Sequence, residues 1–282
     1  MKDIPYQSLI CPGCSSANFT HDPASMTCTT CHTKYPVVHG KVLFKTLSTS
    51  DISDDLDKLK HFFKKYSKLY NLMIQLLSPI YLDFSTKKII NKYVQDNNAI
   101  ALNLGSGNSN LSEKVLNIDI FAYDHVNIVC DIGNIPFADN SVDFIINIAA
   151  LEHVPNPEKV ISETLRILKP GGVVCCYFPF IVPFHASPYD FSRRTKEGMK
   201  VLFKDFETLS LHPGCGPTSG LLWVLQEWLA MVFSFGIKKL YLYLSLFFMI
   251  LTFPLKFIDL LLIKHPLSSN ISSGFLYIGR KS

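Results

Sequence analysis

The most informative segment of the chain is the run Leu102-Asn103-Leu104-Gly105-Ser106-Gly107-Asn108, in which an apolar strand leads directly into a glycine-rich turn. The two glycines let the chain turn sharply and let a ligand lie against bare backbone. A dinucleotide fingerprint would also need a third glycine and an acid about 20 residues farther on. Position 110 is Asn110, and the next acid at a strand end, Asp119, comes 12 residues after Gly107. We therefore reject a nicotinamide site and expect another ligand at this turn.

Short apolar strands alternate with turns and helices on both sides of this segment. A helix is expected from Pro157 to Leu168, where Lys169-Pro170-Gly171-Gly172 stops it. Such alternation predicts an α/β protein with a parallel, doubly wound, Rossmann-like sheet. The first crossover, Ser109 to Leu116, is too short for a full helix and is expected to be a loop. The expected strands are Ala99–Leu104, Val115–Ile120, Asn127–Cys130, Val142–Ile148, Val173–Phe178 and, after an apolar helical insertion, Gly274–Arg280.

Acids follow the second and third expected strands. Asp119 can accept hydrogen bonds from two ribose hydroxyls, and Asp131 can face an adenine amino group. Together with Leu151-Glu152-His153-Val154 and the later Lys-Pro-Gly-Gly turn, the ordered series from residue 99 to residue 180 resembles the class I S-adenosylmethionine-dependent methyltransferases of the small-molecule type. The resemblance implies the cofactor S-adenosylmethionine and a methyltransferase activity.

The resemblance also assigns cofactor contacts. It implies that the glycine turn holds the methionine part, that the acid after the second strand holds the ribose, and that the residues after the third strand face the adenine. In this chain those residues are Gly105, Gly107, Asp119, Asp131 and Ile132. The family usually has an acid in the first strand where this chain has Asn103, whose amide can accept a hydrogen bond from the cofactor but adds no charge.

Four of the eight cysteines form two pairs near the N-terminus. Cys11-Pro12-Gly13-Cys14 is followed, after 13 intervening residues, by Cys28-Thr29-Thr30-Cys31. Two such knuckles predict a tetrahedral Zn²⁺ site whose metal supplies much of the folding free energy of so small a module. His32 and His39 are alternative ligands. The segment resembles the zinc ribbon of activators of tRNA and protein methyltransferases, which implies a structural role or a contact with a protein partner.

Candidates for the acceptor side follow the fourth and fifth strands, because ligands bind at the carboxyl ends of such sheets. His153 is either catalytic or a structural residue of its loop. The loop from Pro179 to Thr195 resembles one in methyltransferases found with bacterial polysaccharide genes. We predict that His185 is a base or an acceptor ligand and that Asp190 and Arg193 orient it. The alternative is a salt-bridged lid without a base.

Residues 217–265 form a strongly apolar block, although the chain as a whole is 48% hydrophobic. Residues 240–255 are uncharged but too few to span a bilayer comfortably. Because the final strand must return to the sheet, a single crossing is excluded. The remaining possibilities are an in-plane or re-entrant helical hairpin, two crossings, or a buried hairpin that covers the sheet or forms a dimer. A lysine-bearing helix expected at residues 51–77 would add to a membrane-facing surface.

These observations predict three regions: a zinc ribbon at 1–47, a linker helix region at 48–97, and a methyltransferase domain at 98–282 with an apolar helical insertion at 217–270. With no apolar leader before the first cysteine pair, we expect a cytoplasmic protein, peripheral or monotopic on the inner face of the membrane. The expected reaction is O-methylation of a sugar or lipid-linked glycan. A lipid or quinone methyltransferase and a non-catalytic adaptor are the alternatives. The net charge of +4 is too small to indicate nucleic-acid binding.

Overall fold

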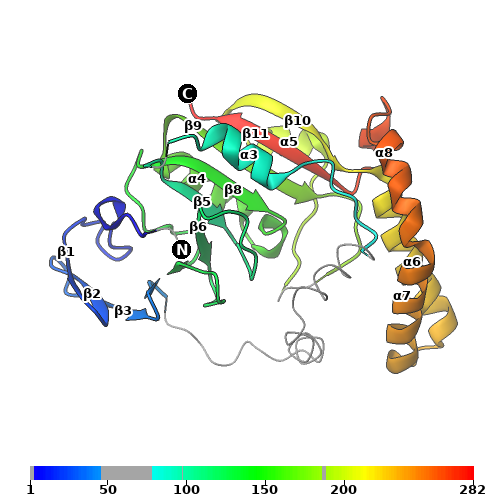
Figure 1. Ribbon diagram of the computed structural model, residues 1–282, viewed down its shortest axis with the longest axis horizontal. Helices are drawn as coiled ribbons and strands as arrows, with labels where there is room; N and C mark the ends of the chain where they lie inside the picture. Colours follow the sequence, from blue (N-terminus) through cyan, green and yellow to red (C-terminus); the bar gives the residue numbers. More distant parts are fainter. Residues whose placement is uncertain (1–2, 46–77, 97, 186–188) are drawn as a thin grey trace.

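The computed structural model describes residues 3–45, 78–96, 98–185 and 189–282. In this part of the chain a single mixed sheet of eleven strands runs through the molecule, with helices on both faces of its central part (Figure 1). The helix expected at residues 51–77 lies outside the described residues, as do residues 186–188. The Rossmann-like α/β class predicted from the sequence is confirmed.

The central sheet is mixed, whereas the sequence predicted a parallel one. Its strands are β5 (Ala101–Leu104), β6 (Leu116–Asp119), β7 (Ile128–Val129), β8 (Val142–Ile148), β9 (Leu168–Pro179), β10 (Glu207–Cys215) and β11 (Gly274–Arg280), in the order β7-β6-β5-β8-β9-β11-β10. Strand β11 runs antiparallel to both of its neighbours, β9 and β10, and the other neighbouring pairs are parallel. Cys215 pairs with Gly274, so residues 216–273 begin and end side by side and reverse the chain like an enlarged hairpin loop.

Three capped helices cover the sheet. They are α3 (Thr86–Tyr93), α4 (Pro157–Ile167) and α5 (Lys196–Leu202). Asn156 caps α4 by accepting a hydrogen bond from the Lys159 amide, and Pro157 suits its first turn. Helices α4 and α5 lie on one face of the sheet, where α4 buries Val160 and α5 buries Met199. Helix α3 buries its apolar side on the other face. Helix α4 passes straight into β9, so the Lys-Pro-Gly-Gly turn begins a strand rather than a loop.

The cysteine-bearing segment extends the sheet at one edge. Its strands are β1 (Phe19–Asp22), β2 (Ser25–Cys28), β3 (Lys34–Val38) and β4 (Lys41–Leu43). Strand β4 lies parallel to β7, with Val42 opposite Ile128. Leu9, which follows the short helix η1 (Tyr6–Ser8), bridges to Phe137, and both side chains are fully buried in the main core. The segment therefore shares its core with the central sheet.

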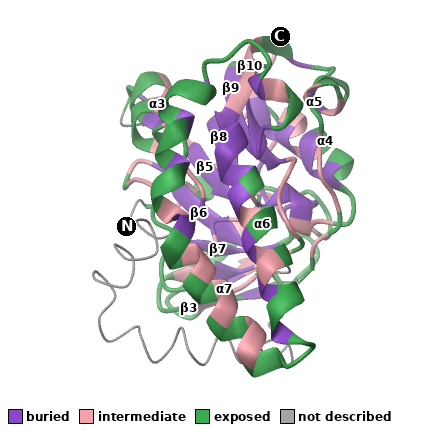
Figure 2. Ribbon diagram, turned by 90° about the vertical axis from the view of Figure 1, so that its right-hand side faces the viewer, coloured by how far each residue is buried: buried purple, intermediate pink, exposed green. Residues whose placement is uncertain are grey.

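The apolar insertion projects from the sheet as a helical hairpin, defined here as residues 217–262. It contains α6 (Pro217–Ser234), α7 (Lys238–Thr252), the 3-10 helix η4 (Phe253–Ile258) and α8 (Asp259–Leu262), and the short η5 (Ser268–Asn270) leads on to β11. Figures 1 and 2 show α6 and α7 side by side at one side of the molecule, with much of α7 exposed. Buried Asp259 fixes the hairpin by accepting hydrogen bonds from the Thr218 and Ser219 amides, 2.8 Å each.

Candidate active site

A cavity of about 720 Å³ opens at the carboxyl ends of the parallel strands. Successive parts of its wall come from the turns after β5, β6, β7 and β8, which is where ligands bind in doubly wound sheets. Its lining includes Gly105, Ser106, Gly107, Asp119, Ile120, Phe121, Asp131, Ile132, Gly133, Ile148, Ala149, Ala150, His153, Val154, Tyr189 and Phe191. The structure thus brings together five of the six residues predicted to bind a cofactor.

The glycine turn after β5 needs its glycines for two different reasons. Gly105 has a φ of +66°, and a Cβ there would lie 2.5 Å from the Cβ of Ala150. Gly107 has a φ of +54° with open space around it, and its amide donates a 2.7 Å hydrogen bond to Asp119 Oδ2. The turn therefore presents bare backbone to the cavity and is held by the acid at the end of the next strand.

Two carboxylates face the cavity in different surroundings. Asp119 is 7% exposed; it accepts hydrogen bonds from the Gly107 amide at Oδ2 and from the Phe121 amide at Oδ1. Burial raises the pKa of Asp119, and these backbone donors oppose that rise. Asp131 is exposed, and its Oδ1 accepts a 2.7 Å hydrogen bond from the Gly133 amide.

Asn103, the sixth residue predicted to contact a cofactor, lies elsewhere. It is 2% exposed within β5, and its side-chain amide donates a 3.0 Å hydrogen bond to Asn117 Oδ1 on the neighbouring strand. It is not part of the cavity lining. Its amide therefore serves to join β5 and β6.

A cluster of three ionisable side chains adjoins the cavity. Glu152 and His153 lie in the short helix η3 (Leu151–His153) after β8, and His185 lies in the loop after β9. Glu152 Oε1 is 3.9 Å from His153 Nε2 and 3.8 Å from His185 Nε2. Glu152 is fully buried, whereas the side chains of His153 and His185 are 16% and 28% exposed. The neighbouring Glu152 carboxylate raises the pKa of His185.

The loop after β9 is tied together by an ion pair. Asp190 accepts a hydrogen bond from the His185 amide at 2.9 Å and two from the Arg193 guanidinium. Arg193 also donates to the Pro183 carbonyl at 3.0 Å. This guanidinium lowers the pKa of Asp190 to about 2. The arrangement suits both the orienting role and the salt-bridged lid considered from the sequence.

Aromatic side chains connect the cluster to the hairpin. Trp223 of α6 packs against His185, with ring centroids 5.3 Å apart, and His153 meets His185 edge-on at 5.3 Å. Tyr189 and Phe191 are exposed and line the cavity. Since the hairpin starts at the carboxyl end of β10, it borders the same edge of the sheet as the cavity.

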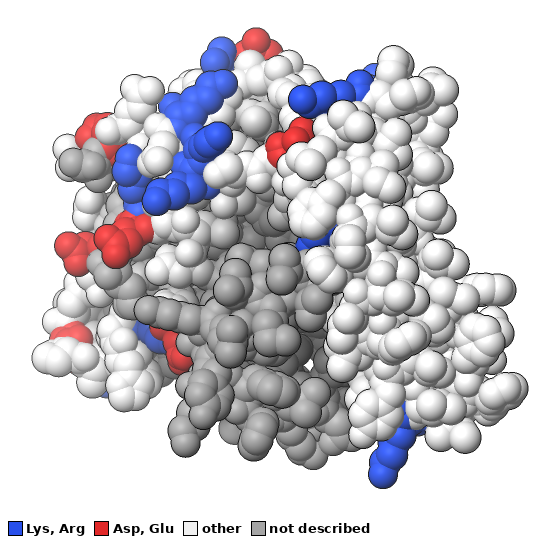
Figure 3. Space-filling model, turned by 45° about the vertical axis from the view of Figure 1, so that its right-hand side comes forward, with Lys and Arg blue, Asp and Glu red and all other residues white. Residues whose placement is uncertain are grey.

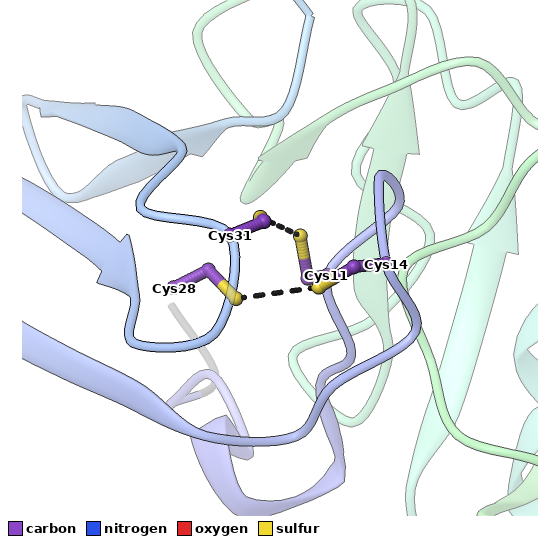
Figure 4. Close-up of side chains that lie close together, drawn as sticks. All are labelled: Cys11, Cys14, Cys28 and Cys31. Atoms are coloured by element: carbon purple, nitrogen blue, oxygen red, sulfur yellow. Dashed lines mark hydrogen bonds between the residues drawn. The ribbon is translucent and has the colours of Figure 1, made fainter.

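The four N-terminal cysteines converge (Figure 4). The Sγ atoms of Cys11 and Cys31 are 3.5 Å apart, and those of Cys14 and Cys28 are 3.6 Å apart. Four thiolates around Zn²⁺ at about 2.3 Å would be separated by about 3.8 Å, so the donor set fits that metal. The candidate ligand group contains neither His32 nor His39.

The two cysteine knuckles also have matching backbones. The residue after each pair has a left-handed conformation, with a φ of 58° at Ser15 and 59° at His32. In each knuckle that residue's amide donates to the carbonyl of the first cysteine, at 2.8 and 2.9 Å. Such turns direct amide groups toward the sulfur atoms and suit a metal-thiolate centre.

Sequence reasoning missed Glu152 and Trp223 as members of the site. Glu152 stands next to His153 in the sequence, and this adjacency was the one available signal. Its complete burial depends on tertiary packing around the short helix after β8, and a local sequence pattern does not show such packing. The sequence placed Trp223 only within the apolar block at residues 217–265. Its contact with His185 arises because the hairpin packs back against the sheet.

The part of the chain that matches a known protein family lies in the central sheet. Residues 90–176 match a protein-family model described as "Methyltransferase domain". An uncharacterised methyltransferase of Mycobacterium tuberculosis (strain H37Rv) is 47% identical over 51 residues, covering 18% of this chain and 20% of that protein. The ubiquinone/menaquinone biosynthesis C-methyltransferase UbiE of Rickettsia prowazekii is 29% identical over 115 residues, covering 38% and 41%.

Among solved structures, a chain from the complex between the Haloferax volcanii Trm112 methyltransferase activator and a methyltransferase superposes with a TM-score of 0.45 at 13% identity, covering 82% of this chain and 99% of that one. The chain spans about a fifth of the length of the mycobacterial relative and 41% of the rickettsial one. The fold is a Rossmann-like methyltransferase fold.

Proposed function

We propose that the protein is an S-adenosylmethionine-dependent methyltransferase. The observation that carries this proposal is the cavity of about 720 Å³, whose wall combines two positive-φ glycines with carboxylates after the next two strands. The family match over residues 90–176 supports the same chemistry. The cofactor, when bound, supplies an electrophilic methyl group on its sulfonium. The protein must then align an acceptor and exclude water.

The cofactor contacts follow from the hydrogen-bond capacity of the site. The backbone at Gly105 and Gly107 would hold the methionine part. A carboxylate offers about four acceptor positions, and Asp119 uses two of them on the Gly107 and Phe121 amides. Two positions remain for the ribose hydroxyls. Asp131 and Ile132 would face the adenine, and we place no cofactor contact on Asn103.

The acceptor would bind between the cofactor cavity and the hairpin. His153 belongs to the cavity wall, and His185 stands behind it against Trp223. His185 would act there as a base on an acceptor hydroxyl or as a ligand that holds the acceptor. Asp190 and Arg193 would keep its loop in place.

We further propose that the hairpin lies at a membrane surface. Among the described residues, one helical segment, Lys238–Leu262, is long and apolar enough to cross a membrane by length and composition, and only 22% of its most apolar window is buried. A core helix of that composition would be mostly buried. In Figure 3 most of the right-hand surface, where the hairpin lies, is uncharged, with a basic side chain at its lower end. Exposed apolar residues include Leu221, Trp228, Met231, Phe233, Phe235, Tyr243, Phe247, Leu251 and Leu261.

Some polar groups of the hairpin join its helices to one another, whereas Lys238 and Lys239 at the start of α7 are exposed. Gln226 donates a 2.6 Å hydrogen bond to Thr252, and Tyr241 donates to Glu227. The first pair is buried and the second is partly buried, and hydrogen bonds between helices of this kind occur where outer faces meet lipid. Because the hairpin borders the proposed acceptor side through Trp223, a membrane-bound hairpin favours an acceptor with a lipid part. The acceptor would be a hydroxyl of a sugar or lipid-linked glycan on the inner face of the membrane. The second candidate is a lipid or quinone acceptor, favoured by the match to UbiE.

The cysteine group would hold a structural Zn²⁺. Its Sγ separations and paired knuckles fit the metal, and β4 and Leu9 connect it to the central sheet. The outer strands β1 and β2 remain available for a protein partner. In the adaptor alternative, such contacts would be the sole activity.

Product analysis tests the proposed function. Purified protein with isotopically labelled S-adenosylmethionine should label the lipid-linked glycan fraction of a membrane extract from the source organism, and Asp119→Ala should reduce the label when the cofactor is below saturation. Asp124→Ala, an exposed acid in the loop after β6, is the matched control. Label only in the quinone or phospholipid fraction would replace the glycan acceptor with the second candidate. If the folded protein binds neither S-adenosylmethionine nor its demethylated product, the methyltransferase proposal is wrong and the non-catalytic adaptor is the remaining alternative.

A further inference from the structure

The environment of Glu152 presents a charge problem. Its side chain is fully buried, and both carboxylate oxygens lack a hydrogen-bond partner among the described residues. An ionised carboxylate without partners costs several kcal/mol to bury. The groups that face it are the imidazoles of His153 and His185. A positive charge between the carboxylate and the two rings would remove the penalty.

The two imidazoles are held with their Nε2 atoms toward Glu152. His153 Nδ1 is 2.5 Å from the Tyr189 carbonyl oxygen, and His185 Nδ1 is 3.0 Å from the Pro183 carbonyl oxygen. A carbonyl can only accept, so Nδ1 of His153 carries the proton. Nδ1 of His185 carries it when it donates to the Pro183 carbonyl rather than accepts from Arg193 Nη2, which lies 3.3 Å away. In the neutral rings both Nε2 lone pairs then point toward the carboxylate. A hydrogen bond from Nδ1 to a backbone carbonyl is typical of histidines that bind a metal ion through Nε2.

The distances suit one ion. The three candidate ligand atoms lie within 4.8 Å of one another, and Glu152 Oε1 is 3.8 and 3.9 Å from the two Nε2 atoms. Ligands bonded to one ion at about 2.1 Å are separated by about 3.0–4.2 Å, depending on the bond angle. The two imidazoles would need to approach each other only slightly. The nearby Arg193 guanidinium is already paired with Asp190.

We propose that Glu152, His153 and His185 bind one divalent transition-metal ion, such as Mn²⁺, Fe²⁺, Co²⁺ or Zn²⁺, which holds the hydroxyl of the acceptor. Two imidazoles and one carboxylate are ligands for this class of ion, and three protein ligands leave open positions. Two adjacent open positions fit a vicinal diol, such as a sugar presents. This role of the ion rests on the proposed methyl transfer, whereas its binding does not.

The reaction balances without a redox change. A hydroxyl bound to the ion has a lowered pKa and loses its proton to water. An electron pair of that oxygen forms the new bond to the methyl carbon as the bond from this carbon to sulfur breaks, and sulfur keeps the bonding pair. His185 is then a metal ligand rather than a base. Because His153 belongs to the wall of the cofactor cavity, the ion would lie at the edge of that cavity.

Titration with Mn²⁺ tests the site. Electron paramagnetic resonance of the purified full chain, with its zinc content already measured, should show one bound Mn²⁺ per chain. Glu152→Gln, which keeps size and loses charge, and His185→Asn should each weaken binding at least tenfold. His125→Asn, at an exposed histidine, is the control and should bind as the native chain does. Calorimetry with S-adenosylhomocysteine should give the same affinity in all four proteins.

The outcomes separate the two claims. If the native protein binds S-adenosylhomocysteine but no Mn²⁺, Co²⁺ or second Zn²⁺, the metal site is wrong and the methyltransferase proposal is unaffected. The charge that compensates Glu152 is then a proton on His185. Equal Mn²⁺ binding by native protein and Glu152→Gln also overturns the metal site. Metal binding without S-adenosylhomocysteine binding supports the site and removes the proposed function. If Glu152→Gln fails to fold, His185→Asn alone decides, because that side chain is partly exposed.

Discussion

Trp223 of α6 packs on His185 of the loop after β9, with ring centroids 5.3 Å apart and planes inclined by 38°. Trp223 belongs to the apolar hairpin, and His185 belongs to the proposed acceptor side of the cavity. The contact exists because residues 216–273 leave and rejoin the sheet between Cys215 and Gly274. Any acceptor that reaches His185 must therefore pass close to the hairpin.

Trp223→Ala should weaken acceptor binding and leave cofactor binding unchanged. An aromatic pair contributes about 0.5–1.5 kcal/mol beyond its buried area, so the KM for the acceptor should rise about two- to tenfold. Steady-state methyl transfer measures this, with Tyr6→Ala, in η1 and 38% exposed, as the control outside the hairpin and the cavity. An unchanged KM in Trp223→Ala would separate the hairpin from the acceptor site.

Gly105→Ala should destabilise the fold more than Gly107→Ala. Both positions have positive φ, which costs a non-glycine residue about 1–2 kcal/mol. Only at Gly105 would the new Cβ also overlap Ala150, at 2.5 Å. Overpacking adds about 1–3 kcal/mol. Urea unfolding of both variants gives the comparison, and equal losses would mean that the close approach of Gly105 and Ala150 is unimportant.

Local patterns predicted much of the central sheet. Apolar runs bounded by glycines or acids marked β5, β6 and β8, because burial on both faces and tight turns leave a direct trace in the sequence. Strand β10 was missed, since it lies at the edge, is half-exposed and contains Pro213 and Gly214. The direction of β11 and the pairing of β4 with β7 depend on non-local contacts.

The candidate site was predicted in the same uneven way. The turn after β5 and the acids after β6 and β7 follow the chain order of the strands, so Gly105, Asp119 and Asp131 could be named. Asn103 looked similar, but its partner Asn117 lies on the neighbouring strand and draws its amide out of the cavity lining. Glu152 could be predicted as a site residue only with knowledge of which side chains become fully buried.

Cys28→Ser should lose the metal of the ribbon and lower the melting temperature. The thiolate would be one of the four proposed zinc ligands. Because β4 and Leu9 connect the cysteine-bearing segment to the main core, disorder there would remove buried contacts. For a chain of this size each kcal/mol lost lowers the midpoint by about 2–4 °C. Metal analysis should fall from one zinc per chain to none, while Cys175→Ala, in β9, keeps its zinc. Full zinc content in Cys28→Ser would contradict the four-cysteine site.

Phe235→Glu combined with Leu261→Glu should release the protein from membranes. The two side chains are 84% and 77% exposed, so the native fold should tolerate the change while contact with lipid becomes unfavourable. Flotation with vesicles that contain anionic lipid measures the bound fraction, and Val201→Glu, 69% exposed on α5, is the control. Native protein that is monomeric without detergent and does not float would refute the membrane proposal, and a stable dimer would assign the hairpin to self-association.

Cofactor binding to the Asp119 site tests the central claim most directly. Calorimetry of S-adenosylhomocysteine with the native chain should show one site, and Asp119→Ala should weaken it by about 1–3 kcal/mol, roughly 5- to 150-fold, because buried hydrogen bonds to the ribose are lost. Asp124→Ala should bind as the native chain does. Binding heat from the native chain, with an affinity that is lowered in Asp119→Ala but not in Asp124→Ala, is the predicted result. No heat from a native chain with a cooperative melting transition, or equal binding by native protein and Asp119→Ala, would contradict it.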